Sequence, residues 1–114
     1  MIQIYHNSRC GKSRNCLALL EKSNKKFEII NYLTNPPSFD ELNTIIKKLN
    51  VEPIELVRKK EKIWIENFKD IEMNSKEIVQ AMVDNPILIE RPIVIIGESA
   101  IIGRDLEKVE SFLL

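Results

Sequence analysis

Residues 1–20 of the chain read MIQIYHNSRCGKSRNCLALL. Ile2, Ile4 and Tyr5 make a short apolar run that begins almost at the first residue, as a short strand does. Polar side chains interrupt this run over residues 6–9, and from Cys16 onward leucines recur at helical spacing. We interpret the pattern as a strand, a tight loop and a helix, with Cys10 at the N-terminus of the helix.

A helix N-terminus is a place where a thiol ionises readily. The unpaired N–H groups of the first turn and the positive end of the helix dipole both favour a thiolate at Cys10. His6 and Arg9 would favour it further if their side chains face the sulfur. The same N–H groups, which begin at Gly11 and Lys12, can also hold an oxyanion. The stretch therefore predicts a nucleophile and an anion-binding site in one place.

The length and charge of the chain limit its function classes. It has 114 residues and a formal net charge of zero, from 17 basic and 17 acidic side chains. This length is typical of one domain, so we expect a single domain over residues 1–114. The balanced charge lacks the basic excess of a nucleic-acid-binding protein. No stretch is long and apolar enough to span a membrane, and the N-terminus lacks a signal peptide.

The cysteines and the single histidine also restrict the chemistry. Six helical residues turn the chain by about 600°, so Cys10 and Cys16 face different ways and are not expected to form a disulfide. We expect Cys16 in the core and the protein in a reducing cytoplasm. One histidine and two cysteines that face apart cannot assemble a tetrahedral metal site, and no glycine-rich nucleotide loop is present. We therefore expect no metal and no bound cofactor.

The middle of the chain reads as a helical insertion over about residues 38–85. Ser38 and Asn74 each open a capping-box pattern, and Pro53 fits the first position of a short helix. Trp64 and Phe68 lie four apart in a further short helix over residues 61–68, where we expect them to pack as core residues.

Strand patterns stand on both sides of this insertion. Residues 27–32 are strand-like and complete a βαβ unit with the opening strand and helix. Residues 93–96 and 100–102 predict two strands joined by a short loop over 97–99, and Asp105 predicts the cap of a last helix. The apolar face of that helix is expected to comprise Leu106, Val109, Phe112 and Leu113. The fold class is therefore α/β: one mixed β-sheet flanked by helices, with the helical insertion between the βαβ and ββα halves.

The arginines are placed differently from the lysines. The twelve lysines tend to fall in runs typical of solvated faces, whereas the five arginines stand singly beside turns or element ends. The planar fork of an arginine suits oxyanions. Each of the five, Arg9, Arg14, Arg58, Arg91 and Arg104, is therefore a candidate anion-binding residue.

The chain resembles the glutaredoxin-linked arsenate reductase (ArsC) family, which has a thioredoxin-like fold with a helical insertion. The resemblance runs nearly end to end and rests on several separate motifs in the right order. These motifs are Tyr5-His6-Asn7, Cys10-Gly11, Ser13-Arg14-Asn15, Asn35-Pro36-Pro37-Ser38, Leu56-Val57-Arg58-Lys59, Asn85-Pro86-Ile87-Leu88-Ile89 and Arg91-Pro92-Ile93-Val94.

The resemblance implies a mechanism in which Cys10 attacks arsenate. Glutathione, as co-substrate, and glutaredoxin would then resolve the adduct and release arsenite, so that the enzyme needs only one cysteine of its own. In this family His6 and Ser13 would favour the thiolate, and Arg58, Arg91 and Arg104 would bind the oxyanion. Pro92 would be the cis-proline of thioredoxin-like folds.

Two other functions are compatible with the sequence. Spx-type regulators share this fold and bind RNA polymerase, although those with a redox switch carry a second cysteine where this chain has Ser13. The chain could also be a reductase of another thiol adduct. The residues leave the oligomeric state open, with a monomer as the simplest form.

Overall fold

The computed structural model describes residues 1–114, which form two compact units. One unit comprises Met1–Asn35 and Arg91–Leu114, and the other comprises Pro36–Glu90. The helical insertion that the sequence predicts over about residues 38–85 lies within the second unit. That the whole chain acts as one domain stays a prediction.

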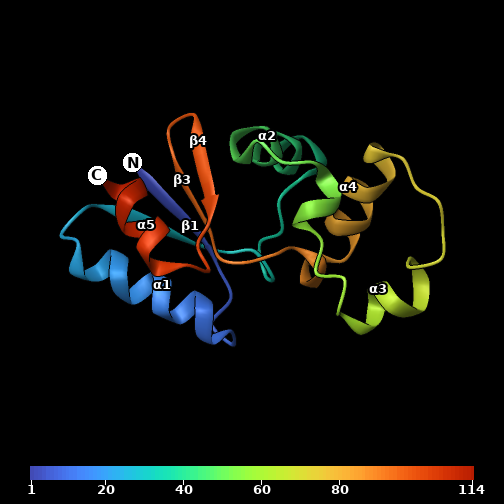
Figure 1. Ribbon diagram of the computed structural model, residues 1–114, viewed down its shortest axis with the longest axis horizontal. Coiled ribbons are helices and arrows are strands. Elements are labelled where there is room, and N and C mark those ends of the chain that lie inside the picture. Colours follow the sequence, from blue (N-terminus) through green and yellow to red (C-terminus); the bar gives the residue numbers. More distant parts are fainter. The chain divides into compact units, whose positions relative to one another are not determined.

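The first unit is built on a four-stranded mixed sheet (Figure 1). Its strands are β1 (Ile2–His6), β2 (Phe27–Asn31), β3 (Ile93–Ile96) and β4 (Ser99–Ile102), in the order β2-β1-β3-β4. β1 pairs parallel with β2 and antiparallel with β3, and β3 pairs antiparallel with β4. Helix α1 (Gly11–Lys22) joins the two parallel strands, and α5 (Leu106–Leu113) follows β4. This arrangement confirms the predicted α/β class and its βαβ and ββα halves.

The core of the first unit lies between the sheet and these two helices. It consists of alternate residues of the strands and one face of each helix: Ile2, Ile4, Cys16, Leu20, Val94, Val109 and Leu113. Burying one such apolar side chain contributes about 1.5–3 kcal/mol, so this cluster orders α1 against β1. Cys16 has an exposed fraction of 0%, which confirms its predicted place in the core.

The second unit is helical. Its elements are α2 (Phe39–Leu49), η1 (Pro53–Leu56), α3 (Lys62–Asn67), α4 (Ser75–Asp84) and η2 (Pro86–Leu88). Both predicted capping boxes are present, with Ser38 and Asn74 as the N-caps of α2 and α4. Trp64 and Phe68 stack with ring centroids 5.6 Å apart, and Trp64 is buried as expected for a core residue.

Some local predictions need correction. The β3–β4 loop is Gly97-Glu98, because Ser99 already belongs to β4, and Gly97 takes a positive φ of 58° there. β2 ends at Asn31, one residue before the predicted end. Pro53 does begin a short helix as predicted, and this helix is of the 3₁₀ type. Leu106 is 38% exposed and does not belong to the buried face of α5.

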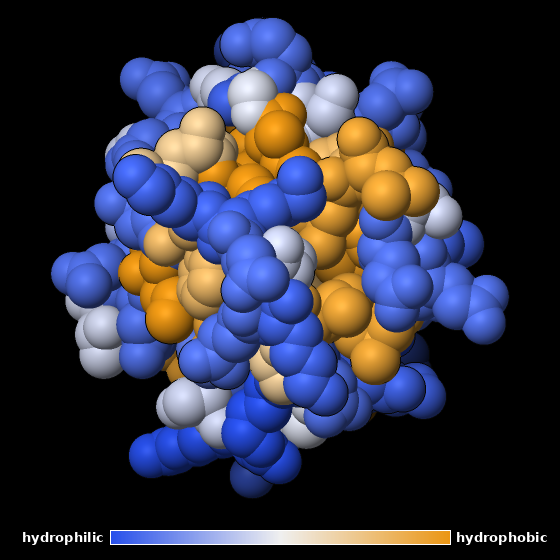
Figure 2. Space-filling view, turned by 90° about the vertical axis from the view of Figure 1, so that its left-hand side faces the viewer, coloured by the Kyte–Doolittle hydropathy of each residue, from blue (hydrophilic) through white to orange (hydrophobic).

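Apolar side chains also reach the surface of the first unit. Figure 2 shows the side on which the two termini lie, where apolar patches alternate with polar side chains. No helix in the structure has the length and apolar character needed to cross a membrane.

Gly103 is tightly packed against residues from three other parts of the chain. A Cβ at this position would lie 2.9 Å from Cys16 Sγ, 3.2 Å from Pro92 Cγ and 3.3 Å from Val109 Cγ2. The Gly103 N–H also donates a 2.7 Å hydrogen bond to the Pro92 carbonyl oxygen, which fixes the backbone beside α1. The position therefore has no room for a side chain.

We predict that Gly103→Ala lowers the free energy of unfolding by about 1–3 kcal/mol, because the new methyl group overpacks this contact. The cost should be smaller in a Cys16→Ala background, where the closest neighbour of the methyl group is gone. Urea unfolding of both single variants and the double variant measures the coupling. An equal cost in both backgrounds would show that Cys16 does not limit the space.

Candidate functional site

Cys10 lies at the junction between the sheet and helix α1. It is the N-cap of α1, with extended backbone angles, and its exposed fraction is 9%. Its N–H donates to the Asn7 carbonyl oxygen at 3.0 Å, and its own carbonyl oxygen accepts from the Arg14 N–H at 3.0 Å. The backbone of Cys10 is therefore fixed by a turn on one side and by the first helical hydrogen bond on the other.

The surroundings of Cys10 lower the pKa of its thiol. Desolvation is the largest single influence and raises the pKa. The Ser13 N–H, the Arg91 charge, the Lys12 N–H and a hydrogen bond from the Arg91 side chain together outweigh it. The pKa of Cys10 therefore lies below its ordinary value, as the position at a helix N-terminus predicts.

His6 and Ser13 form a buried pair next to this thiol. His6 Nδ1 lies 2.6 Å from Ser13 Oγ, and the Asn7 N–H donates to the same Oγ at 3.0 Å. Burial, and then the charge of Arg14, lower the pKa of His6, so the imidazole is neutral at pH 7. His6 thus contacts Ser13 and is not among the groups that lower the pKa of Cys10. The role of His6 in favouring the thiolate, which the resemblance implies, stays a prediction.

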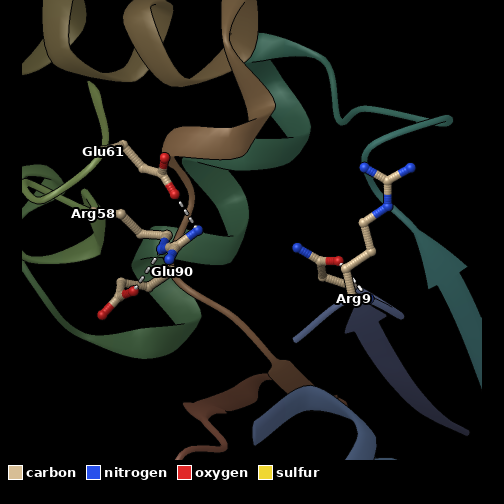
Figure 3. A network of polar contacts seen from close by, with 5 residues as sticks. Arg9, Arg58, Glu61 and Glu90 are labelled. Atoms are coloured by element: carbon tan, nitrogen blue, oxygen red, sulfur yellow. Dashed lines mark hydrogen bonds and ion pairs between the residues drawn. The ribbon is translucent and has the colours of Figure 1, made fainter. Parts of the chain in front are cut away.

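Arg9 is the other residue that would favour the thiolate if its side chain faces the sulfur. It is exposed, its N–H donates to Asn7 Oδ1 at 2.9 Å, and Figure 3 shows its side chain extended with the guanidinium at the far end. Arg9 is absent from the groups that lower the pKa of Cys10. The cation that does so is Arg91, which comes from a distant part of the chain.

Asn7, in the loop, and Arg14, in helix α1, make hydrogen bonds that the sequence analysis did not predict. Asn7 uses its N–H, its carbonyl oxygen and its side-chain oxygen in three hydrogen bonds across residues 7–13. Arg14 Nη1 donates to the Ser8 carbonyl oxygen at 3.0 Å. An asparagine two residues before a main-chain N–H that it can bond is a turn signal, so the role of Asn7 was detectable.

The structure brings six of the predicted site residues together at this loop. They are Cys10, Gly11, Lys12, Ser13, His6 and Arg91. Arg91 is 8% exposed, and the peptide bond between Arg91 and Pro92 is cis, the form that the resemblance implies. Arg104 is exposed in the turn before α5.

Arg58 belongs to the second unit, where it is paired with two carboxylates. Arg58 Nη1 lies 2.6 Å from Glu61 Oε1, and Arg58 Nε lies 3.6 Å from Glu90 Oε1 (Figure 3). Glu61 is a local partner, three residues after Arg58, whereas the pairing with Glu90 follows from no local sequence pattern. No three His, Cys, Asp or Glu side chains in the chain cluster closely enough to hold a metal ion.

The two cysteines differ sharply in their surroundings. Both are free, but burial raises the pKa of the Cys16 thiol to about 11. Cys10 combines a lowered pKa with an exposed fraction of 9%, whereas that of Cys16 is 0%. Only Cys10 is suited to nucleophilic chemistry in the folded protein.

We predict that alkylation of Cys10 by iodoacetamide follows a pH midpoint below the ~8.5 of a free thiol, because the folded site favours the thiolate. The rate is measured in Cys16→Ala, with Cys10→Ala as the control for reaction at Cys16. Folded Cys10→Ala should react negligibly near neutral pH. A midpoint at or above the free-thiol value would contradict the thiolate site.

Comparisons with known proteins extend along nearly the whole chain. The family model for the ArsC family matches residues 5–112. The chain is 42% identical to the uncharacterized protein YfgD of Escherichia coli K12, over 95% of this chain and 92% of that protein. It is 37% identical to an arsenate reductase of Neisseria meningitidis serogroup A, over 98% of this chain and 97% of that protein.

A solved structure gives the same result. The arsenate reductase from Vibrio cholerae matches with a TM-score of 0.91 and 38% identity, over 96% of this chain and 95% of that one. The likeness of sequence and the likeness of fold thus both extend over nearly the whole chain. The residues that the family model matches include the thiol loop and the strand after Pro92. The resemblance seen in the sequence motifs is confirmed, and the chain belongs to the ArsC family.

Proposed function

We propose that this chain is an arsenate reductase-like oxidoreductase in which the Cys10 thiolate attacks the arsenic atom of arsenate. The observation that supports this most is the lowered pKa of Cys10, which two main-chain N–H groups and Arg91 produce together. A thiolate held by anion-stabilising groups is the nucleophile that such a reaction needs.

The reaction begins with bond formation between Cys10 Sγ and arsenic. One arsenate oxygen takes up protons and leaves as water, which gives a thiol-bound As(V) species. Glutathione displaces a second oxygen as water, so that its sulfur and Cys10 Sγ are both bound to As(V). The glutaredoxin thiolate then attacks the glutathione sulfur, the bond between that sulfur and arsenic breaks, and its electron pair stays on arsenic, which becomes As(III). Glutathione and glutaredoxin are left as a mixed disulfide, and water hydrolyses the Cys10–As(III) bond to release arsenite and the Cys10 thiol. Overall, two thiols become one disulfide, while arsenate becomes arsenite and water.

The residues around Cys10 have separate roles in this proposal. The first-turn N–H groups of Gly11 and Lys12 and the guanidinium of Arg91 bind the oxyanion and offset its repulsion of the thiolate. Arg58 and Arg104 are proposed as the two further oxyanion-binding arginines of the family pattern. His6 acts as a positioning residue, because the 2.6 Å contact between its Nδ1 and Ser13 Oγ holds Ser13 in the first turn of α1.

An external thiol fits this site better than an internal disulfide relay. Cys16 has an exposed fraction of 0% and a pKa of about 11, so it is not available to attack an adduct on Cys10. Ser13 occupies the position of the second cysteine in a dithiol enzyme. We therefore propose glutathione and glutaredoxin as the partners of a monomeric, single-cysteine enzyme in a reducing cytoplasm.

We predict that Cys10→Ser abolishes arsenate reduction, whereas Cys16→Ser retains most of it, because only Cys10 can form the arsenic–sulfur bond. The measurement is NADPH oxidation coupled through glutathione reductase, with arsenate, glutathione and glutaredoxin present. Far-ultraviolet circular dichroism confirms that both variants are folded. Equal losses in the two folded variants would indicate an internal disulfide relay.

We predict that Arg91→Lys lowers kcat/KM for arsenate by at least about tenfold, because a lysine keeps the charge but loses the planar fork. Charge-assisted hydrogen bonds of this kind contribute about 1.5–3 kcal/mol each. Arg58→Lys should have a similar effect and Arg104→Lys a smaller one. Lys47→Ala, an exposed position on α2, is the control and should change kcat/KM by less than about twofold.

We also predict that sulfate or phosphate competes with arsenate and slows alkylation of Cys10, since each is a tetrahedral oxyanion. The experiment compares alkylation rates at constant ionic strength, with chloride as the control anion. No protection by any oxyanion, together with unchanged kinetics in Arg91→Lys, would contradict the oxyanion site and favour a role in binding another protein.

A further inference from the structure

Arg58 is held in a fixed place within the second unit by its backbone. The Arg58 N–H donates to the Leu88 carbonyl oxygen at 2.7 Å, and the Glu90 N–H donates to the Leu56 carbonyl oxygen at 2.8 Å. Val57 and Ile89 form an antiparallel bridge between these two hydrogen bonds. The two short segments therefore bring the side chains of Arg58 and Glu90 side by side.

Two of the three guanidinium nitrogens of Arg58 are each paired with a carboxylate. Arg58 Nη1 lies 2.6 Å from Glu61 Oε1, which is the distance of a charge-assisted hydrogen bond. Arg58 Nε lies 3.6 Å from Glu90 Oε1, which is too far for a hydrogen bond. Nη2 takes part in neither pair. The three side chains are only 22–26% exposed, whereas those of the Lys62–Glu66 pair on α3 are 84% and 57% exposed.

The side chain of Glu61 is committed to Arg58. Glu61 is the N-cap residue of α3, but its side chain makes no capping hydrogen bond there. Its N–H donates to the Arg58 carbonyl oxygen at 3.1 Å, in the turn that places the two residues together. Figure 3 shows the carboxylate of Glu61 directed at the guanidinium. The carboxylate of Glu61 is thus an anion of the protein itself that is already bound to the guanidinium of Arg58.

An oxyanion that binds Arg58 through Nη1 must take the place of this carboxylate. The two anions carry the same kind of charge and use the same N–H donor, so they cannot both hold it. We propose that Glu61 is a positioning residue that keeps Arg58 paired in the empty enzyme and gives way to the oxyanion substrate on binding. This inference rests on the proposed role of Arg58 in binding that oxyanion.

The consequence is that Glu61 sets the affinity of Arg58 for anions. Displacing it subtracts the free energy of the Arg58–Glu61 pair from the free energy of oxyanion binding. Glu90 stays beside Nε as a second counter-charge while Nη1 changes partner. Because one anion replaces the other, the partly buried charge of Arg58 always has a counter-ion at Nη1.

Glu61→Gln tests this exchange, because the amide keeps the shape of the side chain and removes its charge. We expect the KM for arsenate to fall about fivefold, equivalent to about 1 kcal/mol, with kcat changed less than about twofold. Glu66→Gln is the matched control: it removes one carboxylate from the same helix without touching Arg58, and KM should not change. An unchanged or raised KM in Glu61→Gln would overturn the proposal.

The same substitution, made in a variant that lacks the Arg58 guanidinium, shows whether Glu61 acts through Arg58. In Arg58→Met, the further change Glu61→Gln should leave the KM for arsenate as it is, since no guanidinium remains to be released. A fivefold fall that persists in this background would mean that Glu61 acts by general charge repulsion, and would overturn the proposal.

Protection of Cys10 from alkylation by sulfate separates this inference from the proposed function, because no reduction of arsenate is needed. Stronger protection in Glu61→Gln than in the wild type and Glu66→Gln supports the exchange even if the wild type fails to reduce arsenate. Equal protection in all three proteins would overturn it, even if the wild type proves to be an active reductase.

Discussion

The site depends on the contact between the Cys10 sulfur and the N-terminus of α1. Burial of the thiol opposes ionisation, and only the combined donors of the first helical turn and Arg91 reverse that effect. Those donors are in place because β1 ends at His6, the loop turns back at Asn7, and Ser13 anchors the first turn through two buried hydrogen bonds. The chemistry therefore requires an ordered loop as much as it requires a cysteine.

The same helix shows how position decides the behaviour of a residue. Cys10 and Cys16 lie six residues apart, but one caps the helix beside donors and a guanidinium, and the other faces the sheet and helix α5. The first has a lowered pKa, while the second is an apolar core residue with a pKa of about 11. Gly103 packs so closely on Cys16 that the core role of this cysteine constrains another turn of the chain.

The features that the sequence predicted best are those set by neighbouring residues. The strand–loop–helix around Cys10 and the capping box at Ser38 depend on local spacing, so the patterns were sufficient. The neutral His6 and the pairing of Arg58 with Glu90 depend on burial and on residues far apart in the sequence. No periodicity encodes such contacts, which is why the sequence alone predicts neither of them.

The most direct test of this account is the pKa of Cys10, measured from the ultraviolet absorbance of the thiolate as a function of pH. Cys10→Ser supplies the background, and Arg91→Met removes the cation that is held responsible for part of the shift. The account predicts a midpoint below that of a free thiol in the wild-type protein and a higher midpoint in Arg91→Met. A wild-type midpoint at or above the free-thiol value, or one that Arg91→Met leaves unchanged, would contradict it.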